Sequence, residues 1–197
     1  MTELLSLRSD AEIEKLREAG RIVAQVLNRL EGLVKPGVST LELDREAHRL
    51  IRAAGATPSF LGYGEPPFPG SICASLNEEV VHGIPNARRL LRDGDIISID
   101  VGALLDGYHG DAARTFMVGT VKPEVRKLVE ITEQCFWEGF KMATVDHRLG
   151  DISAAVQQMA EQNGYGVVRE LTGHGVGRRL HEPPDLPNYG RAGHGMR

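Results

Sequence analysis

Apolar residues recur with the period of an α-helix along residues 13–30. Ser9 and Glu12 stand just before this stretch with the spacing of a capping box, so we expect the helix to begin there. A second amphipathic stretch over residues 39–55 starts at a serine and ends at a glycine, which are typical helix boundaries. The start of the chain is therefore predicted to form two helices.

Residues 57–70 are rich in proline, glycine and aromatic side chains, which predicts an ordered loop rather than a flexible linker. A short strand is expected next, over residues 71–75. An alternating segment then covers residues 95–118 and is interrupted by Asp106-Gly107. An Asp-Gly pair between alternating runs predicts a hairpin with a two-residue turn, in which Leu105 pairs with Tyr108.

This hairpin register brings two aspartates together. Asp111 falls opposite Gly102, two residues from Asp100, so both carboxylates project from one face as diagonal neighbours. The backbones of such neighbours are about 7–8 Å apart. Two carboxylates on one face repel unless a cation lies between them, so we interpret them as a metal site. Strand-end aspartates that reach solvent or backbone amides are the alternative. We expect His109 to pack on the face opposite Asp111. The residues predicted to form the core are Ile97, Ile99, Val101 and Ala103.

The second part of the chain repeats the order of the first. Pro123 is well placed to start a helix, Asp151 opens another, and a glycine again ends the shorter one. The order helix, loop, shorter helix, glycine, strand thus occurs twice. We predict an α+β fold in a single domain, residues 1–197, with two similar halves at about 1–120 and 121–197.

Composition excludes several classes of function. The chain has 197 residues, 41% of them hydrophobic, and a formal net charge of −4, which gives no electrostatic footprint for nucleic acid and no polybasic membrane anchor. No stretch approaches the ~20 apolar residues of a membrane span, and the N-terminal apolar run is too short for a signal peptide. The two cysteines form no disulfide framework or zinc motif, so we expect a cytoplasmic protein.

Three of the seven histidines lie in turn-forming contexts. His174 is surrounded by glycines, His82 precedes Gly-Ile-Pro, and His181 precedes Glu-Pro-Pro. Glycines allow a backbone or a substrate to approach closely, which favours a functional site. An ordinary loop position remains the alternative for each histidine taken alone.

Taken in order over nearly the whole chain, residues 77–85, the hairpin with Asp100 and Asp111, and residues 173–183 resemble the type I methionine aminopeptidases. The resemblance implies the pita-bread fold, in which two α+β halves related by a pseudo-twofold axis enclose a metal site. It also implies a metallo-exopeptidase that removes the initiator methionine from nascent proteins by attack of a metal-activated water.

The resemblance assigns roles to individual residues. Asp100, Asp111 and His174 would bind two divalent metal ions, and manganese, iron or cobalt suit such hard ligands. His82 and His181 would be the catalytic residues that contact the substrate and stabilise the transition state. Aromatic residues that simply fill the core under a loop are the alternative for the expected methionine pocket. Its lining would be Phe60, Tyr63, Phe68 and Cys73.

Further expectations follow from the same resemblance. The partner would be the N-terminal methionine of a nascent polypeptide, met near the ribosome by a monomer without direct nucleic-acid binding. In the family two later strands each carry a metal-site glutamate, and this sequence ends at Arg197 before either. We therefore expect the last strands of the second half to be missing and the chain to be weakened or inactive as a peptidase. A proline-directed peptidase of the same fold and a non-catalytic binding module are the alternative functions.

Overall fold

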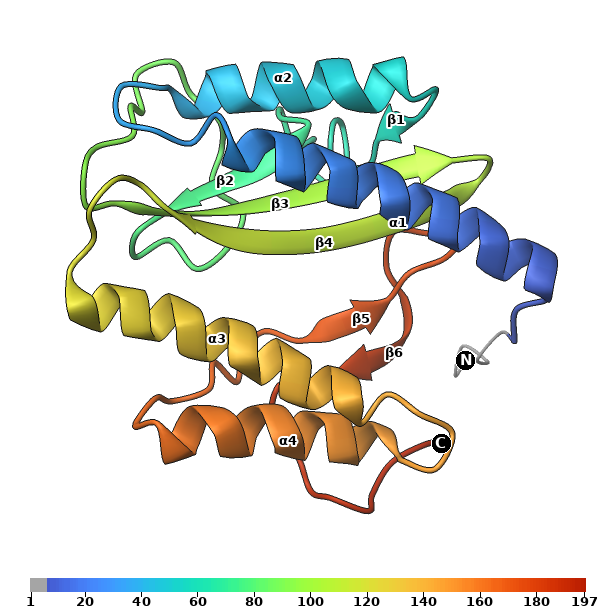
Figure 1. The fold of residues 1–197 in the computed structure, drawn as a ribbon. Coiled ribbons are helices and arrows are strands. Elements are labelled where there is room, and N and C mark those ends of the chain that lie inside the picture. Colours follow the sequence, from blue (N-terminus) through green and yellow to red (C-terminus); the bar gives the residue numbers. More distant parts are fainter. Residues whose placement is uncertain (1–6) are drawn as a thin grey trace. The chain divides into compact units, whose positions relative to one another are not determined.

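The computed structural model describes residues 7–197 (Figure 1). The chain forms two compact units. The first contains the chain up to Lys122 together with Val176–His181, and the second contains Pro123–Gly175 and Glu182–Arg197. Helices and strands occur in both units, which confirms the predicted α+β class.

Two helices open the first unit, as the sequence predicts. α1 spans Asp10–Glu31, and the backbone N–H of Ser9 donates to the carboxylate of Glu12 at 3.0 Å. α2 spans Thr40–Ala53, and its cap Ser39 makes the equivalent bond at 2.8 Å. Each capping box satisfies backbone groups that the first turn of a helix leaves unpaired.

The first unit also contains one antiparallel sheet in which β3 is central. β4 pairs with one edge of β3, while β2 and the short β1 pair with the other edge. The turn at Asp106-Gly107 has φ angles of +48° and +80°, which these residue types tolerate. Leu105 pairs with Tyr108, so the predicted register is confirmed. The strands are β1 (Thr57–Pro58), β2 (Ile72–Leu76), β3 (Ile96–Leu105) and β4 (Tyr108–Met117).

α1 and α2 cover one face of this sheet (Figure 1). The face of β3 toward the helices carries the predicted core residues, all fully buried: Ile97, Ile99, Val101 and Ala103. Gly110 in β4 allows α1 to approach closely, because a Cβ atom there would lie 2.6 Å from the Ala19 carbonyl carbon. The helices thus bury one face of the sheet, and the other face is the one that carries Asp100 and Asp111.

The second unit combines two helices with a small antiparallel ribbon of β5 (Gly173–Gly175) and β6 (Glu182–Leu186). α3 (Pro123–Lys141) starts at the proline, as predicted. α4 (Leu149–Gln162) begins two residues before the predicted start at Asp151. Arg148 is the cap, and its backbone N–H donates to the Asp151 carboxylate at 2.7 Å. Asp151 therefore caps the helix from its third position and is not its first residue.

Three aromatic side chains of α3 are exposed and contact one another. Phe136 is 59% exposed, Trp137 49% and Phe140 60%, and their ring centroids lie 5.0–6.1 Å apart. The residues that α3 buries are Cys135 and Gly139. Within residues 7–197, no helix combines the length and the apolar composition that crossing a membrane requires.

Candidate metal centre

The hairpin β3–β4 brings Asp100 and Asp111 together on the face of the sheet that the helices leave uncovered. Asp111 pairs with Gly102 across a ladder of ten regular pairs, and the Asp100 and Asp111 side chains share a hydrogen bond. Gly102 lets Ser59 and Phe60 pack closely on this face, because a Cβ atom there would lie 2.8 Å from both side chains. The diagonal arrangement derived from the turn is therefore the observed one.

The electrostatics of this pair favour a cation. Burial, followed by the neighbouring Asp100 carboxylate, raises the pKa of Asp111 to about 8. Near neutral pH the pair therefore retains a proton, which lowers the repulsion between the two carboxylates. A divalent cation would displace that proton and bind two hard oxygen donors, so the residues present fit a metal ion.

Cys73 lies on the same face, directly opposite Asp100 in the β2–β3 ladder. Burial and the carboxylates of Asp100 and Asp111 raise the pKa of its thiol to about 12. The thiol is therefore neutral at physiological pH, whereas a cysteine that binds metal does so as thiolate. Cys73 therefore lines the candidate site as a neutral side chain, and Asp100 and Asp111 are the charged groups on this face.

An apolar cluster lies beside the aspartates. Phe60 and Cys73 are buried together with Leu180, and Phe68 packs against them. Three of the four residues predicted for a methionine pocket thus come together, and Leu180 is a member that the sequence reasoning missed. Its position directly before His181 was the available signal.

His82 is placed by the glycine that follows it. The N–H of Gly83 donates to Ser75 Oγ at 3.0 Å, and its carbonyl accepts from Ala74 at 2.8 Å. A Cβ atom on Gly83 would lie 2.3 Å from the Ala74 oxygen, so only glycine allows this approach. His82 itself has φ +60°, and a backbone hydrogen bond links it to the Cys73 thiol. Strained backbone of this kind is common at functional sites.

His181 ends the segment Val176–His181, which belongs to the first unit. This segment is held to β4 because the N–H of His109 donates to the Gly177 carbonyl at 2.8 Å. The imidazole of His181 is exposed and lies 2.7 Å, through Nδ1, from the hydroxyl of Tyr63. Tyr63 therefore lies against His181, outside the buried apolar cluster.

The prediction for His109 was wrong about its face. His109 and Asp111 are two residues apart in a regular strand, so their side chains share a face. The imidazole Nδ1 of His109 lies 2.9 Å from Ser59 Oγ. The packing role predicted for His109 thus occurs on the same face as the aspartates.

His174 lies on β5 in the second unit, where its half-buried imidazole bonds through Nδ1 to the Gly175 carbonyl at 3.0 Å. A carbonyl only accepts, so Nδ1 carries the proton and Nε2 carries the lone pair, the form in which imidazole binds metals. Among residues 7–197 no group of three or more His, Cys, Asp or Glu side chains forms a metal cluster. The structure therefore brings the aspartates together, and the participation of His174 stays a prediction.

Comparison with known proteins identifies the family. The model of the family described as "Metallopeptidase family M24" matches residues 14–197. The chain belongs to this family. A methionine aminopeptidase of Clostridium acetobutylicum is 52% identical over 192 residues, which cover 98% of this chain and 76% of the relative. Methionine aminopeptidase 1 of Bacillus subtilis is 50% identical over 194 residues, covering 98% and 77%.

Solved structures confirm the fold of this M24 chain. The methionine aminopeptidase of Rickettsia prowazekii matches with a TM-score of 0.94 at 39% identity, covering 98% of this chain and 77% of that one. The prolidase of Pyrococcus furiosus matches with a TM-score of 0.81 at 23% identity, covering 96% and 55%, and shares the fold alone. The predicted pita-bread fold is thus confirmed, and membership of a metallopeptidase family implies divalent metal ions.

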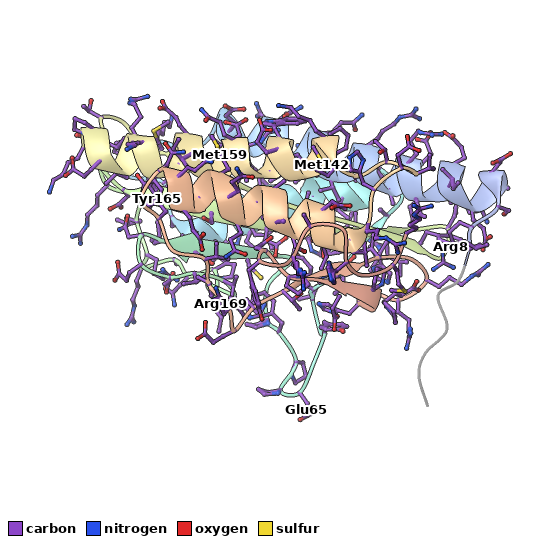
Figure 2. All side chains as sticks on the ribbon, turned by 90° about the horizontal axis from the view of Figure 1, so that it is seen from below. Arg8, Glu65, Met142, Met159, Tyr165 and Arg169 are labelled. Atoms are coloured by element: carbon purple, nitrogen blue, oxygen red, sulfur yellow. The ribbon has the colours of Figure 1, made fainter. Side chains whose placement is uncertain are left out.

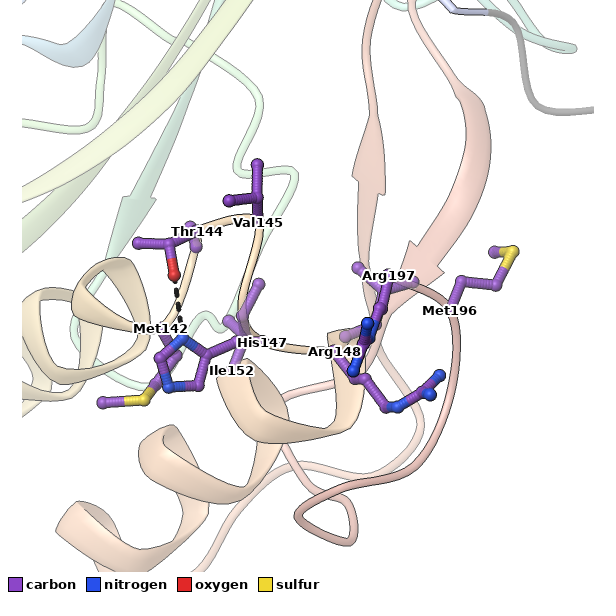
Figure 3. A pocket seen from close by; sticks show the side chains of 10 residues that line it. Met142, Thr144, Val145, His147, Arg148, Ile152, Met196 and Arg197 are labelled. Atoms are coloured by element: carbon purple, nitrogen blue, oxygen red, sulfur yellow. Dashed lines mark hydrogen bonds between the residues drawn. The ribbon is translucent and has the colours of Figure 1, made fainter.

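A separate cavity of about 390 Å³ lies in the second unit of this M24 chain (Figure 3). Its wall includes the loop between α3 and α4, where His147 Nδ1 lies 2.8 Å from Thr144 Oγ1. The other lining residues include Met142, Arg148, Ile152 and Met196. None of the predicted site residues lines this cavity, so its size does not make it the catalytic centre.

Proposed function

We propose that this chain is an aminopeptidase that removes the N-terminal methionine from polypeptides. The observation that carries the proposal is the half-buried pair of Asp100 and Asp111 with an apolar cluster on the same sheet face. Relatives about half identical over nearly the whole chain are methionine aminopeptidases, which supports the same substrate here.

The metal site would consist of Asp100, Asp111 and His174 around two divalent ions, with manganese, iron or cobalt as the candidates. Such ions supply a water of lowered pKa and polarise the scissile carbonyl. His82 and His181 would contact the substrate and stabilise the charge that develops on the carbonyl oxygen. This assignment makes the whole chain, residues 1–197, one catalytic domain with halves at about 1–120 and 121–197.

The specificity pocket would be the apolar cluster. Phe60, Phe68 and Cys73 offer aromatic faces and a neutral thiol, which suit the flexible and polarisable thioether of methionine. Tyr63 would stand at the rim, because its side chain is 47% exposed. A charged or β-branched first residue would fit this lining poorly.

We further propose that the chain acts as a monomer in the cytoplasm, on nascent polypeptides near the ribosome. Both cysteines are free and buried, which fits a reducing compartment. Direct contact with nucleic acid is not part of the proposal, because the net charge of −4 gives no basic footprint.

The test is release of methionine from Met-Ala-Ser, with an X-Pro peptide as the competing substrate, in added Mn²⁺ or Co²⁺. It uses the 197-residue chain and a chimera extended by the C-terminal part of a relative, because the match covers 76% of the length of the Clostridium acetobutylicum relative. Methionine release by either protein, lost on chelation, supports the proposal.

Two results would overturn it. Cleavage of the X-Pro peptide without methionine release would make the protein a proline-directed peptidase. Metal binding by both folded proteins without cleavage of either peptide would make it a non-catalytic binding module. Asp106→Asn is the control variant, since this turn residue is expected to leave methionine release unchanged.

A further inference from the structure

Tyr63 and His181 are 118 residues apart in the sequence, yet their side chains form a hydrogen-bonded pair. The Tyr63 hydroxyl oxygen lies 2.7 Å from His181 Nδ1. The two ring centroids are 5.3 Å apart with planes tilted by 39°. The two rings therefore contact each other at a tilt, and one imidazole nitrogen is occupied by the hydroxyl.

The Tyr63 side of this pair is held by its own loop. The N–H of Tyr63 donates to the Phe60 carbonyl at 2.9 Å, and its carbonyl accepts from Phe68 at 2.8 Å. Gly62 and Gly64 on either side adopt φ angles of +80° and +81°, which let the chain turn tightly around the tyrosine. Glu65, labelled in Figure 2, belongs to the same loop. The backbone of Tyr63 is thus bound on both sides although its side chain is half exposed.

The His181 side is held equally well. Leu180, the preceding residue, is 3% exposed and packs with Phe60 in the apolar cluster. Three residues earlier, the guanidinium of Arg178 stacks over the Tyr108 ring at 4.8 Å and contacts Glu12 at 3.4 Å. The Tyr63 hydroxyl and His181 Nδ1 are therefore each held by an anchored segment. Such support fixes the orientation of the His181 imidazole.

The chemistry of the two groups sets the direction of the bond. A neutral imidazole has one N–H and one lone-pair nitrogen. A phenol oxygen is a weak acceptor because its lone pair is delocalised into the ring, whereas its O–H is a good donor. Donation from Tyr63 to Nδ1 is therefore favoured, and it leaves the proton of His181 on Nε2.

We propose that Tyr63 is a positioning residue that holds His181 in the Nε2–H tautomer. In this form Nε2 donates a hydrogen bond to the substrate carbonyl oxygen while negative charge develops on it. The inference rests on the proposed function and deepens it. A residue of the pocket rim would contact only the methionine side chain, whereas Tyr63 would also set the tautomer of His181. No proton changes hands, since Tyr63 keeps its hydrogen and acts through the bond that it donates.

The experiment compares the full chain with Tyr63→Phe, which keeps the ring and removes the hydroxyl. Long-range ¹⁵N NMR of the histidine-labelled, metal-free protein reports the tautomer, and His181→Gln assigns the signal. We expect a single Nε2–H form that becomes a mixture in Tyr63→Phe. On Met-Ala-Ser, kcat should fall about 10- to 100-fold with KM changed less than about 2-fold, as for loss of an interaction made in the transition state.

Tyr189→Phe is the matched control, because Tyr189 stacks on Arg169 at 4.5 Å in the second unit and should change neither reading. The inference fails if His181 carries its proton on Nδ1, or if Tyr63→Phe leaves the tautomer unchanged. A raised KM with unchanged kcat would make Tyr63 a pocket residue only. The NMR result requires no turnover. If the tautomer shift appears but neither this chain nor the chimera releases methionine, the proposed function is overturned and the positioning role stands.

Discussion

Two hairpins carry the three predicted metal ligands, and they are built differently. β3–β4 pairs ten residues from each strand without a register shift, and its core positions are completely buried. β5–β6 has strands of three and five residues, with an irregularity beside His174 and no buried residue in either strand. The first hairpin places its ligands by backbone register, so changes there should affect both metal binding and stability. The second should affect metal binding alone.

The largest effect is expected for Asp111→Asn. Removal of one carboxylate should weaken Mn²⁺ or Co²⁺ binding by at least ~100-fold, because loss of outer-shell partners alone costs about 10- to 100-fold. The same change should raise the melting temperature of the metal-free chain at neutral pH. It removes a carboxyl group whose pKa is raised by burial and then by Asp100, and which therefore costs stability above its unfolded-state pKa. Calorimetric titration and thermal unfolding in a chelator measure the two effects.

The control is Asp106→Asn at the turn of the same hairpin. Asparagine tolerates the φ of +48° found there, so neither metal affinity nor stability should change. If Asp111→Asn kept its affinity, or if both variants lost it equally, the face that carries Asp100 and Asp111 would not be the metal site.

Gly110→Ala tests the other face of the β3–β4 hairpin. The added methyl group would lie 2.6–2.8 Å from the backbone of Ala19 and Gly20 in α1, which can relieve the overlap only by shifting. We expect a loss of about 2 kcal/mol in the free energy of unfolding. Denaturant titration at neutral pH measures it.

The partner variant is Gly20→Ala, where nothing lies within 4 Å of the added methyl group. Because alanine is the better helix former, this change should stabilise the chain by up to about 1 kcal/mol. Equal stability losses in the two variants would show that the close approach of α1 and β4 is not what Gly110 provides.

The same contrast explains what the sequence could predict. Alternation and an Asp-Gly turn determine the β3–β4 register, so the proximity of Asp100 and Asp111 followed from local rules. His174 lies in a strand of three residues with no alternation to interpret, and it was found only by resemblance. The Tyr63–His181 bond could not be predicted, because it joins two loops whose contact depends on the packing of Leu180 against Phe60.

His174→Ala is expected to have the next largest effect. If Nε2 binds metal as proposed, its loss should weaken binding by at least ~10-fold, or about 1.4 kcal/mol or more, and leave the unfolding free energy unchanged. The matched control is His194→Ala, whose Nδ1 also bonds a backbone carbonyl, that of Ala192, at 3.0 Å. Identical metal affinity in the two variants would remove His174 from the site.

The smallest effect concerns the contact between α1 and the segment Val176–His181 within the first unit. Glu12 accepts a hydrogen bond from Tyr108 at 2.5 Å and contacts Arg178, in the segment that joins β5 to β6.

The Tyr108 hydroxyl, followed by the backbone and side chain of Ser9, lowers the pKa of Glu12 from 4.5 to about 2. A lowered folded-state pKa contributes stability that is complete above pH 4.5 and is lost as the pH falls toward 2. Glu12→Gln should therefore flatten the acid side of the stability curve. Glu14→Gln, on the same helix and paired with Arg17 and Arg21, should not. Parallel acid titrations of the two variants would show that the segment carrying His181 is held by packing of Leu180 and not by this charge.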